Sequence, residues 1–174
     1  MKTLGKETAL AELARMKDDF REKIAAGYEK NAKDCGSCET FGACCLDAHF
    51  VNVHVTKLEA EAVVRVLDRL PPVRQAAVRA RIDDAIETCQ LTATGDTFSR
   101  TFACPLFEKT SGCLVHHEAK PLACINHACY ERREDLPPDE LLEEAERSVE
   151  NLNVRTYRRP AKWLPLPLAI SERI

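Results

Sequence analysis

The sequence predicts a mainly α protein with minor β structure, in which about four helices surround an irregular cysteine-rich metal-binding centre. The chain has 174 residues, which is the size of one ordinary domain. Several long segments place apolar residues at steps of three and four, as amphipathic helices do. Eight of the nine cysteines fall into two clusters within turn-rich segments. Residues 1–174 are therefore expected to form a single domain, with its cysteine-cluster region at about residues 35–130.

The N-terminal helix is predicted over residues 5–30. Its apolar side chains recur at helical spacing with charged residues between them, which is typical of one face packed against a core. Asn31 and the Cys35-Gly36 pair end the segment. The stripe consists of Leu10, Leu13, Met16 (or Lys17 through its methylene stem), Phe20, Ile24 and Tyr28.

The segment from Phe50 to Leu70 predicts a short strand followed by a helix. Apolar and polar residues alternate over Phe50–Val55, with Phe50 or Val51, Val53 and Val55 as the candidate buried positions. Thr56 and Glu59 then have the spacing of a capping box, in which each side chain pairs with the backbone N–H of the other residue. The buried face of the helix is predicted to comprise Leu58, Val63, Val66, Leu67 and Leu70.

A third helix is predicted from about Val73 to Leu91. The Pro71-Pro72 pair interrupts the preceding helix, and Pro72 suits the first turn of the next one. Cys89 continues the apolar stripe of this helix and has no cysteine near it in sequence. Buried free cysteine behaves as a small hydrophobic residue, so Cys89 is assigned to the core and not to a metal site. The stripe consists of Val78, Ile82, Ala85, Ile86 and Cys89.

The C-terminal part predicts one further helix and an extended tail. Thr92–Thr101 is polar with a turn at Gly95-Asp96, and Phe102–Tyr130 is expected to be mostly loop with short extended pieces. The C-terminal helix is predicted at 139–153, with Leu142, Ala145, Val149 and Leu152 inward. The proline-rich tail at 157–174 is expected to lie extended over the domain. Docking of a protein partner through the Trp163 tail is the alternative for this segment.

Composition excludes several classes of partner. The net charge is −3 and aromatic residues are 6% of the chain, so neither a basic surface nor a stacking platform for nucleic acid is expected. No apolar run approaches the length of a membrane span, so no membrane association is expected. The N-terminus is polar and has no apolar signal segment. These observations predict a cytoplasmic protein, in which cysteines remain reduced.

The first cysteine cluster is typical of a metal site. It reads Cys35-Gly-Ser-Cys38, and after five residues Cys44-Cys45. Two cysteines separated by two residues can turn both sulfurs toward one ion, so Cys35 and Cys38 are expected to share a metal. In extended backbone the adjacent Cys44 and Cys45 would point to opposite sides. The adjacent pair would then serve two ions, or one cysteine would bridge while the other binds terminally.

The second cluster supplies the remaining ligands. Glycines near the cysteines, Gly36, Gly42 and Gly112, allow the tight turns that direct backbone N–H groups at sulfur. Eight thiolates favour two metal ions or a multinuclear cluster over a single site with four spare thiols. Zinc and iron both accept four thiolates, so zinc and an iron–sulfur cluster both remain candidates. The expected metal ligands are Cys35, Cys38, Cys44, Cys45, Cys104, Cys113, Cys124 and Cys129.

Other chemistry at the cysteines is less well supported by the residues. A c-type haem motif requires histidine where Glu39 stands. A thioredoxin-like dithiol expects a strand before the cysteine pair, whereas a long helix is predicted there. His127 has ligand spacing from Cys124 and is left open as a further ligand. The other four histidines (His49, His54, His116 and His117) are weaker candidates, and no residue is assigned as catalytic.

With both clusters in view, the chain resembles the YkgJ-type cysteine-cluster family, described as zinc- or iron-chelating. The resemblance covers about Cys35 to Cys129 and includes the CxxC pair with its double cysteine. The matching motifs of the second cluster are Cys104-Pro-Leu-Phe107, Gly112-Cys-Leu-Val-His116 and Lys120-Pro-Leu-Ala-Cys124 followed by Cys129. Lys120 replaces the usual arginine, Ile125 stands where a basic residue often follows the cysteine, and His116 replaces a common tyrosine.

The resemblance implies a prokaryotic, metal-binding protein. Its relatives imply an iron–sulfur oxidoreductase-like activity, or iron–sulfur-assisted protein methyl transfer as in flagellin lysine N-methylases. The alternative is a non-enzymatic, zinc-stabilised structural or interaction module. No glycine-rich phosphate loop or nucleotide fingerprint is present in the sequence, so a separate cofactor domain is not expected.

Overall fold

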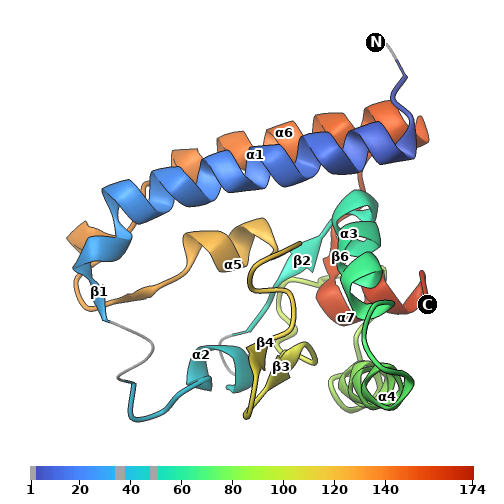
Figure 1. The fold of residues 1–174 in the computed structure, drawn as a ribbon, viewed down its shortest axis with the longest axis horizontal. Helices are drawn as coiled ribbons and strands as arrows, with labels where there is room; N and C mark the ends of the chain where they lie inside the picture. The colour runs from blue at the N-terminus through green and yellow to red at the C-terminus, as the bar shows by residue number, and fades with distance from the viewer. Residues whose placement is uncertain (1–2, 34–37, 48–50) are drawn as a thin grey trace. The chain divides into compact units, whose positions relative to one another are not determined.

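The computed structural model describes residues 3–33, 38–47 and 51–174 (Figure 1). The chain is 55% helical and 7% strand, which confirms the mainly α class with minor β. The α-helices are α1 (Lys6–Gly27), α2 (Ala43–Leu46), α3 (Lys57–Leu67), α4 (Pro72–Thr88), α5 (Leu122–Asn126), α6 (Asp139–Tyr157) and α7 (Leu166–Ser171). Two short 3-10 turns, η1 (Glu29–Asn31) and η3 (Arg133–Asp135), follow α1 and precede α6.

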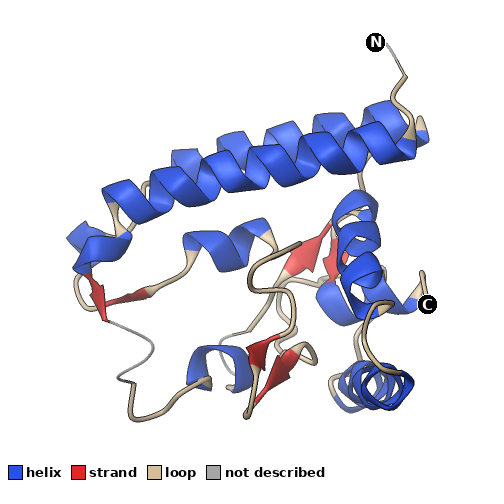
Figure 2. Cartoon of the chain, in the orientation of Figure 1, coloured by secondary structure: helices blue, strands red, loops and turns tan. Residues whose placement is uncertain are grey.

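The strands of the described residues form three antiparallel pairs of two residues each (Figure 2). The first pairs β1 (Ala32–Lys33) with β5 (Cys129–Tyr130). The second pairs β2 (His54–Val55) with β6 (Leu164–Pro165), and the third is the hairpin of β3 (Phe107–Glu108) and β4 (Gly112–Cys113). Pairs this short fix the register of loops and do not form a layer of their own.

The chain divides into two compact units, and each is built from two separate stretches of sequence. The first unit comprises residues 1–41 and 120–161, and the second comprises residues 42–119 and 162–174. The boundary after residue 41 falls inside the first cysteine cluster. It assigns Cys38 to the first unit and the Cys44-Cys45 pair to the second.

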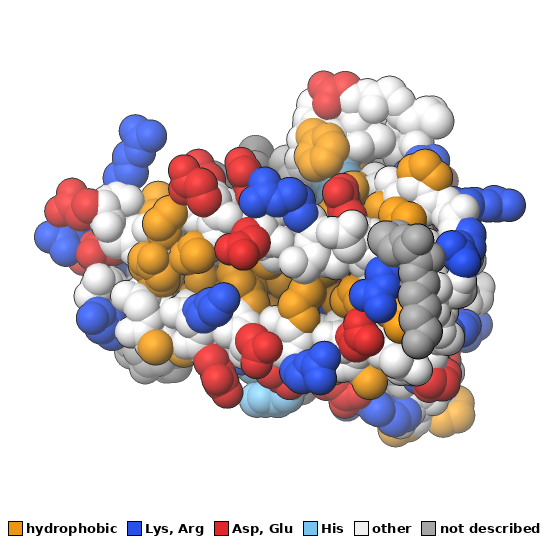
Figure 3. Space-filling view, turned by 90° about the horizontal axis from the view of Figure 1, so that it is seen from above, with side chains coloured by type: hydrophobic (Ala, Val, Ile, Leu, Met, Phe, Trp, Pro, Cys, Tyr) orange, Lys and Arg blue, Asp and Glu red, His pale blue; other side chains and the backbone are white. Residues whose placement is uncertain are grey.

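In the first unit, α1 and α6 lie side by side and run in opposite directions (Figure 1). The short helix α5 packs against both. Figure 3 views this face and shows hydrophobic side chains along the line between the helices, with charged side chains on either side. The predicted stripe of α1 is confirmed from Leu10 to Ile24, with Lys17 rather than Met16 buried, whereas Tyr28 is a half-buried C-cap residue. The buried residues of α1 are Ala9, Leu10, Leu13, Lys17, Phe20 and Ile24, and those of α6 are Ala145, Val149, Leu152 and Asn153.

Polar contacts fix the antiparallel alignment of α1 and α6 at one end. The backbone N–H of Leu4 donates to the carbonyl of Arg155 at 3.2 Å. Arg155 forms an ion pair with Glu12 at 3.6 Å, and Arg158 donates to the hydroxyl of Thr3. The start of α1 is therefore tied to the last turn of α6.

The core of the second unit is larger and is formed chiefly by α3, α4 and α7. Helix α7 packs against both α3 and α4, and the β2–β6 pair lies beside it. Phe102, in the loop before β3, is fully buried in this core. The other fully buried members with large side chains are Val55, Ile82, Leu106, Leu166 and Ile170.

Helix α3 begins at the predicted capping box. The hydroxyl of Thr56 accepts a hydrogen bond from the Glu59 backbone N–H at 3.4 Å, and the Glu59 carboxylate accepts one from the Thr56 N–H at 3.2 Å. Both residues are almost completely buried, so water is not available to replace these bonds. The following helix α4 begins at Pro72, as predicted.

We expect Thr56→Ala to lower the free energy of unfolding by about 1 kcal/mol, with an upper limit of about 2 kcal/mol. The substitution leaves the N–H of Glu59 buried without its acceptor. Thr56→Ser keeps the hydroxyl and is the control. Urea denaturation of both variants measures the effect, and equal stability of the two would show that the cap contributes nothing.

Three sequence predictions about the second unit need correction. The strand expected at 50–55 is limited to His54–Val55, and both residues are buried where alternation predicted one. Phe50 lies outside the described residues. Helix α4 ends at Thr88, so Cys89 occupies its C-cap rather than its interior. The assignment of Cys89 to the core agrees with the structure, since its partly buried side chain packs against the core of this unit.

The tail expected to be extended contains a helix instead. Leu166–Ser171 forms α7, with Pro165 at the N-cap and Pro167 in the first turn, where proline loses no helical hydrogen bond. Leu164, Leu166 and Ile170 are buried in the core of the second unit, whereas Trp163 is half-buried. The last long helix, predicted at 139–153, continues to Tyr157.

His54 makes the second unit sensitive to pH. Its ring is buried, stacks on Phe98 with a centroid separation of 4.0 Å, and has Nε2 3.1 Å from the hydroxyl of Thr97. Burial lowers the pKa of His54 below its ordinary value. Below a pH of about 6.5, His54 binds a proton more readily in the unfolded chain than in the folded chain. The free energy of unfolding therefore falls as the pH falls.

We expect wild type to lose more stability than His54→Gln between pH 7 and pH 5. Denaturant unfolding of both proteins across this range is the measurement. The carboxylates and the other histidines are common to both proteins, so the difference between the two slopes isolates His54. Parallel slopes would contradict the assignment.

Candidate metal centre

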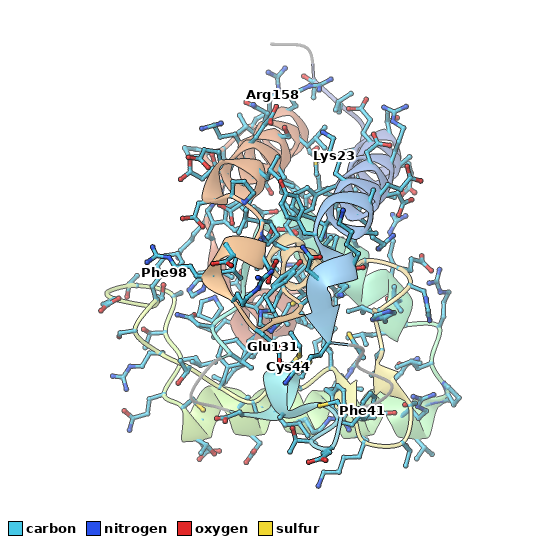
Figure 4. All side chains as sticks on the ribbon, turned by 90° about the vertical axis from the view of Figure 1, so that its left-hand side faces the viewer. Lys23, Phe41, Cys44, Phe98, Glu131 and Arg158 are labelled. Carbon is cyan, nitrogen blue, oxygen red and sulfur yellow. The ribbon has the colours of Figure 1, made fainter. Side chains whose placement is uncertain are left out.

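The second unit brings together four of the predicted ligands: Cys44, Cys45, Cys104 and Cys113. The first two lie on α2, Cys104 lies in the loop before β3, and Cys113 ends β4. Figure 4 labels Cys44 on α2. A backbone hydrogen bond of 2.7 Å from the N–H of Cys104 to the carbonyl of Cys45 joins the two cysteine segments directly. Residues from the two cysteine clusters therefore share one scaffold.

Gly42 places α2 against the β3–β4 hairpin. It is buried, has a φ of 84°, and caps the N-terminus of α2 in the left-handed conformation. A Cβ on Gly42 would lie 2.2 Å from the ring of Phe107, which is far inside van der Waals contact. Only glycine combines this backbone angle with so close an approach of the ring. The sequence suggested a turn here, but its handedness and the contact with Phe107 required the structure.

Backbone hydrogen bonds hold the segment that carries Cys104 and Cys113. The N–H of Phe102 donates to Val51 at 2.9 Å, and the N–H of Phe107 donates to the carbonyl of Cys104 at 3.3 Å. The hairpin register places Cys113 opposite Phe107. Cys113 is therefore fixed on β4, and Cys104 is fixed in the loop that leads into β3.

Two arginines of α4 clamp the same hairpin. Glu108 forms ion pairs with Arg74 at 2.6 Å and Arg81 at 3.2 Å, and it accepts a hydrogen bond from the hydroxyl of Ser111 at 2.7 Å. Arg81 also donates from Nε to the carbonyl of Pro105 at 2.9 Å. The Ser111 hydroxyl, followed by the arginines, lowers the pKa of Glu108. These contacts tie the loop between Cys104 and Cys113 to a regular helix.

The four thiols influence one another. Burial is the largest cause that raises the pKa of Cys45, and negative charge on Cys44, Cys104 or Cys113 raises it further. Cys44 is exposed, and the other three are half-buried. Neighbouring thiolates repel one another unless a cation compensates their charge.

The adjacent cysteines are not in extended backbone. Cys44 and Cys45 occupy successive positions of α2, where side chains are about 100° apart around the axis instead of opposite. The prediction that Cys44 and Cys45 serve two separate ions assumed extended backbone, and the helical conformation of α2 removes that assumption. Both sulfurs can face one region.

The first unit holds a second group of predicted ligands. Cys129 pairs with Lys33 across the β1–β5 ladder, and Cys124 lies on α5. The Sγ of Cys38 is 3.6 Å from the hydroxyl of Thr40. An ion pair with Glu131 at 2.6 Å is the main cause that raises the pKa of Lys33, and charge on Cys129 and Cys38 contributes in the same direction. Cys35 lies outside the described residues.

Four of the five histidines lie in the described part of the chain. His127 caps the C-terminus of α5 with an exposed side chain, and His116 and His117 are exposed and contact each other edge to face. His54 is engaged by Thr97 and Phe98. His49 lies outside the described residues.

The side chains as they stand do not close around an ion. Among residues 3–33, 38–47 and 51–174, no group of three or more His, Cys, Asp or Glu is arranged to hold a metal. The donor chemistry nevertheless fits a thiophilic metal, because the two segments that carry these cysteines are joined by the backbone hydrogen bond between Cys104 and Cys45. Cysteine sulfur is a ligand that both zinc and iron–sulfur centres accept, so the residues of the second unit fit these groups in kind.

Comparison with protein-family models, curated proteins and solved structures finds no significant match to this chain. The resemblance to the YkgJ-type family therefore stays a prediction that depends on the cysteine spacing and the residues beside the cysteines. Within the described residues, no helix combines the length and the apolar character that a membrane span requires.

Sequence reasoning missed two features of the site. Helix α5, which carries Cys124, was expected to be loop. The signal for it was the Leu-Ala-Cys-Ile-Asn run after Pro121, but five residues are too few for helical periodicity to appear. The Arg74–Glu108–Arg81 arrangement had no sequence signal, because its members are distant in sequence and common on protein surfaces.

Proposed function

We propose that this protein binds zinc or an iron–sulfur centre through its clustered cysteines. The hydrogen bond between Cys104 and the carbonyl of Cys45 carries the proposal, because it places cysteines from two distant segments on one scaffold. Arg74, Arg81 and Glu108 stabilise the hairpin, so it does not depend on the metal for every contact. The metal would hold the thiolates together and offset their mutual repulsion.

The role of the chain's own residues follows from this arrangement. Cys44 and Cys45 supply sulfurs from a helix whose position Gly42 fixes, and Cys104 and Cys113 supply sulfurs from the hairpin. A structural metal of this kind contributes directly to folding. An iron–sulfur centre would add electron transfer, and the exposure of Cys44 would leave the site accessible to a redox partner.

The test is metal analysis of protein purified without oxygen and without chelator. We expect zinc, or iron together with acid-labile sulfide, at the level of about two ions or a cluster per chain. Brown protein with broad visible absorption would support the oxidoreductase-like function. Colourless protein with zinc would support the structural or interaction module. Wild-type protein that carries neither metal, and takes up neither on reconstitution, would contradict the proposal.

Cys89→Ser is the matched control. Cys89 is half-buried against the core and lies outside both cysteine groups, so the variant should keep the full metal content. Removal of the Cys89 thiol should cause only a small decrease in the free energy of unfolding. Metal loss in Cys89→Ser equal to that of Cys104→Ser would show that the ligand set is wrong.

A further inference from the structure

We propose that residues 92–101 form a pH-sensitive strap, which closes over the imidazole of His54 at neutral pH and opens in acid. The strap belongs to the second unit and connects the end of α4 to Phe102. It contains none of the proposed metal ligands. Its opening is therefore a property separate from metal binding, and it is a local event, unlike the unfolding of the whole unit.

The chain is fixed at both ends of the strap. Before it, Leu91 is buried, and its N–H donates to the carbonyl of Ile86 at 3.0 Å. After it, Phe102 is fully buried, and its N–H donates to the carbonyl of Val51 at 2.9 Å. Within the strap, which the structure describes throughout, Thr97 alone is buried. The strap can therefore move without displacing the core on either side of it.

Hydrogen bonds within the strap shape its turn. The N–H of Thr97 donates to the carbonyl of Gly95 at 3.0 Å. The N–H of Ser99 donates to the carboxylate of Asp96 at 3.2 Å, and the Ser99 hydroxyl donates to the Asp96 carbonyl at 3.1 Å. These bonds join residues that are close in sequence and do not involve the rest of the unit, so they can persist when the strap opens.

The strap is attached to the segment of β2 through Asn52 and His54. The side-chain amide of Asn52 donates to the carbonyl of Phe98. The ring of His54 stacks on the ring of Phe98 with a centroid separation of 4.0 Å, and its Nε2 lies 3.1 Å from the hydroxyl of Thr97. Figure 4 labels Phe98 on the strap. The imidazole therefore contributes two contacts to the attachment of the strap.

The closed strap disfavours a charged imidazole. His54 is only 8% exposed, and burial is the main cause that lowers its pKa, whereas the backbone of Asn52 acts in the opposite direction. Opening the strap returns the ring to water, where the charged form is hydrated. The open form therefore binds a proton more readily than the closed form. By linkage, a fall in pH favours the open form.

The charged groups nearest to the ring are engaged elsewhere or exposed. Neither cause of the pKa shift of His54 is a charged group. Both β6 and α7 pack against β2, and neither carries a titratable side chain. In the strap, Asp96 accepts a backbone hydrogen bond and Arg100 is exposed. In α3, Glu59 is engaged in the capping box and Lys57 is exposed. Access of water to the ring, which the strap controls, therefore determines its charge.

Relaxation-dispersion NMR of the wild-type protein at pH 7, 6 and 5 measures the population of the open strap. The probes are the methyl group of Thr97 and the ring of Phe98. We expect this population to increase by up to about tenfold per pH unit below a pH of about 6.5. The methyl groups of Val63 and Ile82, which are fully buried in the core of the same unit, should show no such exchange.

His54→Gln is the matched variant, because glutamine can still form a hydrogen bond with Thr97 but does not titrate in this range. Its strap should show the same exchange at all three pH values. Exchange in wild type that is absent at Thr97 and Phe98, or independent of pH, would overturn the proposal. A pH dependence that persists in His54→Gln would overturn it as well. Equal exchange at the core methyl groups would mean unfolding of the whole unit and would have the same consequence.

Phe98→Ala tests the same linkage from the side of the strap, with a residue that is 64% exposed. Loss of the stacked ring weakens the closed form, so the pKa of His54 should rise toward about 6.5 in an NMR titration of the imidazole. Val73→Ala removes another exposed apolar side chain, from the first turn of α4, and should leave the pKa of His54 unchanged. An equal pKa of His54 in wild type and Phe98→Ala would show that the strap does not control the charge of the ring.

Discussion

Replacing Gly42 with alanine is expected to destabilise the protein by about 2–5 kcal/mol and to impair metal binding by the second unit. Two costs add. A non-glycine residue in the left-handed region costs about 1–2 kcal/mol, and the new Cβ would overlap the ring of Phe107, at a further cost of about 1–3 kcal/mol. Chemical denaturation and metal analysis of the same preparations measure both effects.

Gly95→Ala is the matched control for Gly42→Ala. Gly95 has almost the same backbone angle, with a φ of 82°, but a Cβ there would meet no atom within 4 Å. The control therefore carries the cost of the backbone angle without the overlap and should retain its metal. Adding Phe107→Leu to Gly42→Ala should recover part of the loss. Equal destabilisation of the two alanine variants would show that the contact with Phe107 is unimportant.

Phe102→Ala is expected to cost about 3–5 kcal/mol of stability. Phe102 is completely buried in the core of the second unit, and its N–H donates to Val51. It precedes Cys104 by two residues, so collapse of the core around it would also displace that proposed ligand. Urea unfolding followed by tryptophan fluorescence and circular dichroism is the measurement.

Phe98→Ala provides the control for Phe102→Ala within the same segment. Phe98 is 64% exposed and contributes mainly its stacking on His54. Its removal should cost no more than about 1 kcal/mol. A loss from Phe98→Ala as large as that from Phe102→Ala would mean that the burial pattern around this loop is wrong.

Local signals in the sequence predicted the helices well. The stripe of α1, the Thr56–Glu59 capping box and the start of α4 at Pro72 all depend on residues within one or two helical turns. Such features are determined by side chains and backbone groups that are close in sequence. These features could therefore be predicted from the sequence.

Long-range features of the site could not be predicted in the same way. The pairing of β2 with β6 joins His54 to Pro165, and the Cys45–Cys104 hydrogen bond joins the two cysteine clusters. Nothing near either residue specifies its partner. The helical state of Cys44 and Cys45 was also missed, because a four-residue helix gives no periodic signal and depends on the capping position of Gly42.

The second unit is built from two distant stretches of sequence, and this affects when it can fold during synthesis. Its core requires Leu164, Leu166, Ala169 and Ile170, which follow the whole of α5 and α6 in the chain. A ribosome therefore releases the four cysteines of this unit well before the segment that completes their surroundings. Domains fold as their chain emerges, so this unit has to wait while the intervening helices are made. We expect a nascent chain arrested before residue 162 to leave its second-unit thiols open to alkylation, so the proposed metal binding would be a late step of maturation.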